Sequence, residues 1–418
     1  MNKKHFIPFF FAWKTITTHR ARTALALLGV VIGVFAVVVV TSLGDGVKGF
    51  VLGQVESFGS DLIQVEIKIP STTAMSSENS TGRAQGTQIT TLTVKDGEAI
   101  DKLGNVAAVY AGTIGQERAT YGSIGKRIQL FGTGAAVAEV DSNLVLESGR
   151  FFTDEEASSL AQVAVLGSET KDTFFGTGDA VGQSITLKGD KYRVIGVLKE
   201  RGAVAFLNFD SFTYIPVQTL QKKLLGVDYV QFISVKMIDP SRERETVADI
   251  VALLRNRHDI DDPDKDDFSV TSTKEAQKTF SDVLGSLSIL LLALTSISLV
   301  VGGVGIMNVM YVSVSERTSE IGLRKAVGAT SRSILQQFLL EALIITLSGG
   351  LIGIILGMLL TLVLGAVFAS FGFALPLSFS LQSFFLGVGF STAVGLIFGL
   401  APAYRAANLT PMEALRKD

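Results

Sequence analysis

Few residues in this sequence have the types and spacing that catalysis, metal binding or phosphate binding requires. The chain of 418 residues contains no cysteine, and its three histidines, His5, His19 and His258, are far apart in sequence. The lack of cysteine excludes disulfides and thiolate metal sites. The only Gly-Lys pair, at residues 125–126, is followed by arginine, whereas a P-loop needs Ser or Thr there. We therefore expect a chain that is not an enzyme, with no catalytic residue, no metal and no cofactor of its own.

The densest acidic run, Asp259 to Asp267, raises the question of cation binding. An EF-hand loop needs glycine at its sixth position and glutamate at its twelfth. Counted from Asp259, those positions hold Asp264 and Val270. The run fails this pattern and is predicted to be a solvated loop, with weak cation binding as the alternative.

A short charged segment, SERTSEIGLRKAVGATSRSILQQFLLEA at residues 315–342, separates two strongly apolar stretches. Glu316, Glu320 and Arg324 fall on a similar face of a helix, and their spacing suits ion pairs one turn apart. Gly328 is typical of a helix stop, and the hydroxyl residues after it suit a new N-cap. The segment is predicted to form a short helix, a sharp turn and a second helix.

Apolar side chains accompany these charges at Ile321, Leu323 and Val327. An amphipathic helix of this kind can lie on a membrane surface, and it can equally dock onto a cytoplasmic protein. The residues alone leave both interpretations open.

Long apolar stretches position this segment. Mean hydropathy is +0.41 and 18% of residues are charged, and a helix needs about 20 apolar residues to cross a bilayer. The predicted segments are a cytoplasmic stretch 1–23, a first span 24–44, an outer domain 45–282, a second span 283–314, a cytoplasmic loop 315–338, a third span 339–369, a short outer turn 370–381, a fourth span 382–404 and a cytoplasmic tail 405–418.

The distribution of Lys and Arg sets the orientation. Basic residues gather near both termini and in the loop that starts at residue 315, while the 370–381 turn carries no charge. Positively charged loops stay in the cytoplasm, so we expect both termini inside and residues 45–282 outside the cell membrane. The bilayer is the expected environment, and no feature suggests nucleic-acid binding.

The outer domain is predicted to be an α+β fold made of two β-α-β units. One unit comprises a strand at 61–69, a helix at 93–103 and a strand at 106–110, and the other comprises 230–237, 243–257 and 268–271. Short β-rich runs fill about 113–228 as an insertion, and the Ser/Thr/Gly-rich residues 70–91 are typical of a mobile loop. The fold class is therefore a four-span helical membrane protein with a large extracytoplasmic α+β domain.

Small residues recur at four-residue spacing in the spans. The positions are Gly29 and Gly33; Gly349, Gly353 and Gly357; Gly395 and Gly399. Such spacing lets helix backbones approach closely, so these glycines are predicted packing faces. The interiors of the spans lack ionisable residues, which argues against a proton-coupled transporter. Asn308 is the one strong polar side chain of the second apolar run, and a local helix-to-helix hydrogen bond is expected for it.

The loop SERTSEIGLRKAVGA closely resembles the cytoplasmic loop of MacB/FtsX-like ABC transporter permeases, whose pattern is E-R-x-x-E-I-G-x-R-K-A-x-G-A. The C-terminal APAYRAANLTPMEALRKD resembles the ending of the same family. FGSDLIQV, LESGRFFTDEE, VAVLGSET and YRVIGVLKERG resemble its periplasmic core domain, with Asp61 in place of the usual asparagine. The resemblance extends over essentially the whole chain, and residues 283–418 correspond to the FtsX-like permease domain.

The resemblance implies a dimeric permease whose cytoplasmic loop carries a coupling helix that sits on an ABC ATPase. Carried onto this chain, the coupling residues are Glu316, Arg317, Glu320, Ile321, Arg324, Lys325, Gly328 and Ala329. ATP and Mg²⁺ would be held by the ATPase, which is expected to be a separate polypeptide because only 23 residues precede the first span. A homodimer and an extracytoplasmic adaptor are the further expected partners.

Two functions remain open at this point. In the first, ATP hydrolysis moves the outer domain and drives export or extraction of an amphipathic cargo, such as a drug, peptide or lipoprotein. In the second, the outer domain controls a cell-wall hydrolase or senses peptides without transport. Both would use the same coupling loop.

Overall fold

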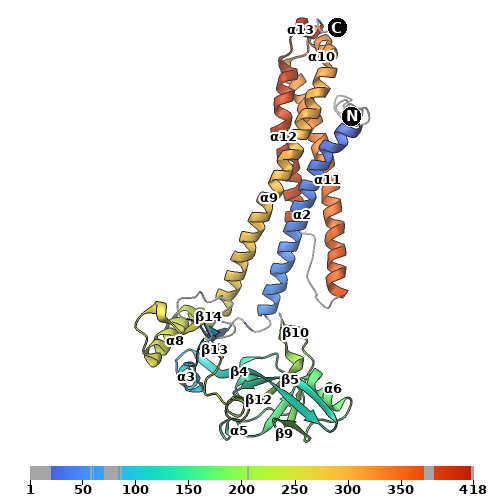
Figure 1. The fold of residues 1–418 in the computed structure, drawn as a ribbon. Coiled ribbons are helices and arrows are strands. Elements are labelled where there is room, and N and C mark those ends of the chain that lie inside the picture. The colour runs from blue at the N-terminus through green and yellow to red at the C-terminus, as the bar shows by residue number, and fades with distance from the viewer. Residues whose placement is uncertain are drawn as a thin grey trace. The chain divides into compact units, whose positions relative to one another are not determined.

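The computed structural model describes residues 20–56, 59, 61–69, 83–84, 87–204, 207–370 and 381–415 (Figure 1). The chain divides into two units, a helical one made of residues 1–50 and 280–418 and an outer one made of residues 51–279. The predicted outer turn 370–381 and the first 19 residues lie almost wholly outside the described part.

Four long helices dominate the described part of the helical unit. They are α2 (Arg20–Glu56), α9 (Thr273–Glu316), α11 (Ser331–Ser370) and α12 (Leu381–Asn408). Each contains a stretch that is long and apolar enough to cross a membrane, by length and composition. Two short helices, α10 (Thr318–Ala326) and α13 (Pro411–Leu415), lie at the same end of this unit (Figure 1).

Glycines lie where α2 and α9 cross. A Cβ on Gly29 would meet the backbone of Gly302, and a Cβ on Gly33 would lie 2.6 Å from the side chain of Leu299. Only a residue without a side chain lets two backbones approach this closely. The crossing therefore depends on glycine in both helices.

A second set of glycines on α11 and α12 faces neighbouring helices. Gly349 lies against Leu27 and Val30 of α2, and Gly353 and Gly357 lie against residues 31–38 of that helix. On α12, Gly395 meets Thr346 and Gly399 meets Ala342, both on α11. All seven predicted glycines thus lie at contacts between helices.

The outer unit contains a mixed sheet of ten strands. The order along the sheet is β14-β1-β13-β4-β5-β12-β7-β9-β6, with β8 paired to β4 and β9. The strands are β1 (Leu62–Ile67), β4 (Val106–Tyr121), β5 (Ile124–Thr133), β6 (Leu146–Gly149), β7 (Val163–Leu166), β8 (Ser184–Leu187), β9 (Asp190–Leu198), β12 (Phe212–Pro216), β13 (Phe232–Met237) and β14 (Phe268–Ser272). Two small hairpins, β2–β3 (Arg83–Ala84 with Thr87–Gln88) and β10–β11 (Ala203–Val204 with Leu207–Asn208), stand apart from it.

Two β-α-β units interlock at one end of this sheet. The first is β1, α3 (Val94–Ile100) and β4, and the second is β13, α8 (Glu243–His258) and β14. Because β13 lies between β1 and β4, and β1 lies between β13 and β14, each unit is split by a strand of the other. Their alternating apolar residues, such as Ile63, Val65, Ile233 and Val235, form a common core with α8.

The β-rich region continues this sheet directly. β4 runs for 16 residues, pairing first with β13 and then along its whole outer part with β5. The predicted strand 106–110 is therefore only the beginning of a strand that passes through residue 113 without a break. Short helices lie in this part of the chain: α4 (Val137–Val140), α5 (Asp154–Ser158), α6 (Ser168–Phe175), η3 (Phe209–Ser211), α7 (Val217–Thr219) and η4 (Leu220–Leu225). Two more, η5 (Pro240–Arg242) and η6 (Pro263–Lys265), precede and follow α8.

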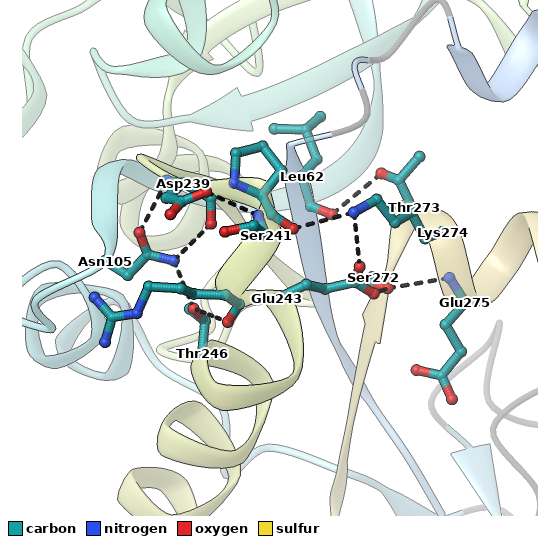
Figure 2. A network of polar contacts seen from close by, with 12 residues as sticks. Leu62, Asn105, Asp239, Ser241, Glu243, Thr246, Ser272, Thr273, Lys274 and Glu275 are labelled. Carbon is teal, nitrogen blue, oxygen red and sulfur yellow. Dashed lines mark hydrogen bonds and ion pairs between the residues drawn. The ribbon is translucent and has the colours of Figure 1, made fainter.

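The start of α9 is bonded into the base of the outer unit (Figure 2). The Ser272 hydroxyl accepts a hydrogen bond from the Glu275 backbone N–H at 3.0 Å and donates one to Glu243. The Thr273 hydroxyl donates to the Leu62 carbonyl, and Lys274 donates to the carbonyl of residue 240 at 3.0 Å. No flexible linker separates β14 from α9.

The acidic run differs partly from the predicted solvated loop. Residues 261–265 are exposed, but Asp266 and Asp267 are buried. Arg255 pairs with Asp266 at 2.7 Å, and His258 bonds Asp267 at 2.8 Å. The carboxylates of Asp266 and Asp267 are therefore bound by side chains of α8 and are not solvated.

Candidate functional site

The charged segment at residues 315–342 forms the helix–turn–helix that its sequence predicts. α9 ends at Glu316, α10 runs from Thr318 to Ala326, and α11 begins at Ser331. The Thr318 hydroxyl donates to the Ser315 carbonyl at 2.8 Å, which fixes the break after α9. Gly328 has φ +100°, a left-handed conformation that glycine adopts without strain. Thr330 accepts from the Ser333 backbone N–H at 3.3 Å and so caps α11.

An ion pair and a hydrogen bond from arginine side chains join the α10 region to α11. Arg324 pairs with Glu320 at 2.5 Å, one turn earlier on the same helix, and donates to Gln337 of α11 at 2.7 Å. Arg317 meets Glu341 of α11 at 3.1 Å. The Glu341 side chain is only 1% exposed, so its charge depends on nearby donors for compensation.

The opposite side of α10 rests on the C-terminal segment. The Lys325 ammonium donates to the carbonyls of Ala407 and Leu409, at 2.5 and 2.8 Å, where α12 ends. A cation there is favourable because the last carbonyls of a helix lack partners and its dipole is negative at this end. Gly322 lies directly against Ala414 of α13, where a Cβ would collide. α10 is therefore held between α11 and α13.

Apolar side chains on this end of the helical unit remain exposed. Leu323 is 60% exposed, Val327 is 83% exposed and Met412 of α13 is 81% exposed. Ile321, two residues before Leu323, is buried with Ile334 and Phe338 in the core of the unit. The helix thus buries one apolar face and presents another.

The eight predicted coupling residues fall into two groups. Arg317, Glu320, Ile321, Arg324, Lys325 and Ala329 are buried or half-buried and contact their own chain, whereas Glu316 and Gly328 are exposed. They lie together on one short helix and its flanking turns. Most of them shape the loop, while Leu323 and Val327 supply the apolar surface.

Sequence reasoning missed several residues of this site: Gln337, Glu341, Ala407, Leu409, Met412 and Ala414. Glu341 carried a signal, since a charge at the edge of an apolar span needs a partner. No sequence signal marks the groups that accept hydrogen bonds from Lys325, because they are backbone carbonyls more than 80 residues away along the chain.

Among the described residues, no group of three or more His, Asp or Glu is placed to hold a metal ion. A cluster of charged groups lies in the outer unit, where His258 sits between Asp267, at 2.8 Å, and Asp96, at 3.6 Å. The hydrogen bond that His258 makes to Asp267 and the nearby Asp96 carboxylate raise the pKa of His258 to about 9. This cluster joins α8 to α3 and β14 and lies in the hydrophobic base of the unit.

Comparison with known proteins identifies both parts of the chain. Residues 23–253 match the model of the MacB-like periplasmic core domain, and residues 292–411 match that of the FtsX-like permease C-terminal domain. The macrolide export ATP-binding/permease protein MacB of Wolinella succinogenes is 35% identical over 97% of this chain, and that of Bdellovibrio bacteriovorus is 34% identical over 97%. The chain spans 60% and 61% of the length of these two relatives.

The crystal structure of the periplasmic region of MacB from Actinobacillus actinomycetemcomitans has a TM-score of 0.45 at 20% identity, covering 54% of this chain and 95% of that one. The family models carry the assignment, since the first alone matches more than half of the sequence. The described structure supplies four helices able to cross a membrane and a sheet-containing domain between the first two. The chain belongs to the MacB/FtsX-like family of ABC transporter permeases.

Proposed function

We propose that this chain is the permease subunit of an ABC transporter in which ATP hydrolysis by a partner ATPase moves the extracytoplasmic domain. The movement drives export or extraction of an amphipathic cargo. ATP and Mg²⁺ are bound by the ATPase, which we take to be a separate subunit. The permease works as a homodimer, with an extracytoplasmic adaptor as a further partner.

The observation that carries this proposal is the construction of α10. A helix that lay flat on a lipid surface would need no tether at either side. α10 is instead tied to α11 through Arg324 and to α12 through Lys325, and it leaves Leu323 and Val327 exposed. A helix held rigidly on two neighbours can receive force from a docked protein and pass it to both.

The direct test is a detergent pull-down of the full-length chain from its native membrane, followed by mass spectrometry. An ABC ATPase should copurify with the wild type. Leu323→Asp or Val327→Asp should remove it, because a charge in a buried apolar contact typically costs about 2 kcal/mol, or about thirtyfold in affinity. Ile238→Asp is the matched control, since Ile238 is 65% exposed on the outer unit.

Two results would count against the docking role. Failure of any ATPase to copurify with the wild type would make α10 a membrane-surface helix. Equal ATPase recovery from Leu323→Asp and Ile238→Asp would place docking elsewhere.

Arg324→Glu provides an independent test: it should uncouple ATP hydrolysis from transport. Combining Glu320→Arg with Arg324→Glu should restore coupling, because the ion pair is re-formed within α10.

The regulatory alternative is separated by a second measurement on the same complex. Cargo-stimulated ATPase activity after reconstitution supports export or extraction. Recovery of a cell-wall hydrolase or sensor protein in the eluate, together with an ATPase rate that no amphipathic cargo changes, would favour regulation.

A further inference from the structure

α9 and α12 contact each other toward the end of the helical unit that carries α10. A Cβ on Gly303 of α9 would collide with the ring of Phe398 of α12. Further along both helices, the Arg405 guanidinium of α12 lies over the ring of Tyr311 of α9, 5.6 Å from the ring centroid. Both contacts advance toward the C-terminal ends of the two helices, so α9 and α12 run in the same direction here.

Arg405 is a cation whose position is fixed but whose charge is not neutralised within the described chain. It is exposed, it lies in the last turn of α12, and no carboxylate among the described residues pairs with it. The π face of the Tyr311 ring attracts the guanidinium. Stacking on a ring leaves the N–H groups at the edge of the guanidinium able to donate to an acceptor. The arrangement therefore presents a positioned, planar donor to a ligand.

Exposed apolar side chains precede this cation on both helices. On α9, Val300 is 52% exposed and Val304 is 39% exposed, and on α12, Ile397 is 68% exposed. Val300, Val304 and Tyr311 follow one another at steps of four and seven residues and so share one side of α9. Ile397 lies eight residues, about two turns, before Arg405. We call these five residues the α9–α12 surface.

The two helices contribute to the same flank of their contact. At about 100° per residue, Tyr311 lies about 80° around α9 from Gly303, and Ile397 lies about 100° around α12 from Phe398 in the opposite sense. Parallel helices that face each other must be turned in opposite senses to reach one side. The α9–α12 surface is therefore shared by both helices, and its apolar residues are followed by a ring and a cation.

Asn308 lies at the level where this surface changes from apolar to charged. It follows Val304 by four residues and precedes Tyr311 by three. Its side chain is exposed and makes no hydrogen bond among the described residues. In the apolar region of a bilayer, a polar amide costs free energy unless it finds a partner. An ester carbonyl of a phospholipid would accept a hydrogen bond from this amide.

We infer that the α9–α12 surface binds one anionic phospholipid. The phosphate accepts hydrogen bonds from Arg405, and the acyl chains lie along Val300, Val304 and Ile397. Guanidinium and phosphate match in charge and in geometry, and basic sites between spanning helices hold anionic headgroups. The order of groups on the surface, apolar side chains, then an amide, then a cation, matches the order of groups in a phospholipid from acyl chain to phosphate.

A matched comparison lies at the same end of the unit. Arg332 of α11 is also exposed, but no aromatic ring among the described residues lies against it. Leu340 follows Arg332 by eight residues and is 46% exposed. If surface charge alone gathered anionic lipid, the two arginines would act equally. A site requires that only the α9–α12 surface selects the anionic lipid.

Quenching of tryptophan fluorescence by brominated acyl chains reports which lipid occupies a surface. The single native tryptophan, Trp13, is first replaced by phenylalanine. A new tryptophan is then introduced by Ile397→Trp on the α9–α12 surface or by Leu340→Trp on α11. The full-length variants are reconstituted in mixtures of phosphatidylglycerol and phosphatidylcholine, with bromine on one lipid or the other. The extent of quenching gives the relative affinity of the two lipids at each position.

Ile397→Trp should report an about fivefold preference for phosphatidylglycerol, because one arginine near a headgroup contributes about that factor. Arg405→Ala in the same background should abolish the preference, while Arg405→Lys should keep part of it because the charge remains. Tyr311→Leu should lower the preference about twofold, since it removes the ring under the guanidinium. Arg332→Ala should leave the preference unchanged, and Leu340→Trp should bind the two lipids equally.

Three results would overturn the inference. Equal preference at Ile397→Trp and Leu340→Trp would mean that anionic lipid gathers around the whole basic end. A preference that survives Arg405→Ala would mean that another group attracts the lipid. A tryptophan at position 397 that neither lipid quenches would show that protein, such as a second copy of the chain, covers this surface. The reconstituted chain contains neither ATPase nor cargo, so each of these results leaves the proposed function standing.

Discussion

The ion pair between Arg317 and Glu341 attaches the start of α10 to α11. Glu341 is 1% exposed, and its partner Arg317 is 19% exposed, with 3.1 Å between their charged atoms. A buried carboxylate is tolerated only when cationic or hydrogen-bonding groups compensate it. The pair fixes the turn between α9 and α10 onto α11, so the geometry of the loop depends on a charge within the apolar bundle.

Replacing only one residue of this ion pair should destabilise the fold far more than replacing both with apolar residues. Arg317→Ala leaves the buried Glu341 charge without this guanidinium and should lower the free energy of unfolding by about 3–5 kcal/mol. Arg317→Met with Glu341→Leu should recover most of that loss. Thermal unfolding of the detergent-solubilised proteins measures both changes, and Arg317→Ala as stable as the wild type would contradict the assigned burial.

At the scale of elements, several side-chain hydrogen bonds fix the junction of β14 and α9. Ser272 is buried and caps α9, while Thr273 and Lys274 bond to β1 and to η5. Asn105 and Asp239 exchange two hydrogen bonds close by, and Asn105 also donates to Thr246 of α8 (Figure 2). The helix therefore starts as part of the base of the outer unit.

Ser272→Ala should free the first turn of α9. Loss of an N-cap hydroxyl costs about 1 kcal/mol, and the mutation also removes the hydrogen bond to Glu243. We expect faster amide hydrogen exchange in residues 273–276, with no change in β7 or β9, and weaker coupling of ATP hydrolysis to transport. Ser269→Ala is a suitable control, because Ser269 lies on the same strand but does not cap α9. Equal exchange in both variants would argue against the cap.

At the scale of the molecule, electrostatics give the outer unit a defined pH window. Burial raises the pKa of Asp96, but the nearby His258 imidazole and hydrogen bonds from Arg257 and Thr93 outweigh it and hold the pKa below its usual value. The pKa of His258 is raised to about 9 by its hydrogen bond to Asp267 and by the nearby Asp96 carboxylate. Asp96 therefore stabilises the fold above about pH 4, and His258 does so most strongly below about pH 6.5.

The stability of the outer unit should fall as pH rises from about 6.5 through 9, because folding then no longer retains the His258 proton. A pKa raised from about 6.5 to about 9 corresponds to a loss of about 3 kcal/mol. Hydrogen exchange of α8 and β14 in the full-length protein, corrected for its intrinsic pH dependence, measures the change. His258→Gln should flatten the response, and an equal response in that variant would exclude His258 as its source.

The sequence was sufficient to predict the elements with strong periodicity and the two β-α-β units, because apolar alternation and turn residues mark them locally. It did not show that the strands of the two units interlock, because strand order depends on pairing between distant segments. The length of β4 was not predictable. Residues 111–121 lack a clear alternation of apolar and polar side chains, so only their pairing with β5 shows that the strand continues to Tyr121. The helix-to-helix hydrogen bond expected for Asn308 was wrong: the side chain is exposed and makes no such bond among the described residues. The sequence shows that Asn308 lies on a helix but not which face of that helix the bundle covers.

The contacts of α10 with α12 and α13 also bear on biosynthesis. Lys325 and Gly322 find their neighbours at Ala407, Leu409 and Ala414, more than 80 residues further along the chain. A ribosome adds roughly 5–20 residues per second, so α10 waits several seconds for these neighbours to be made. The contacts of α10 are therefore complete only after residue 414 has been made, so a polypeptide interrupted before that point lacks the finished surface that we propose for docking.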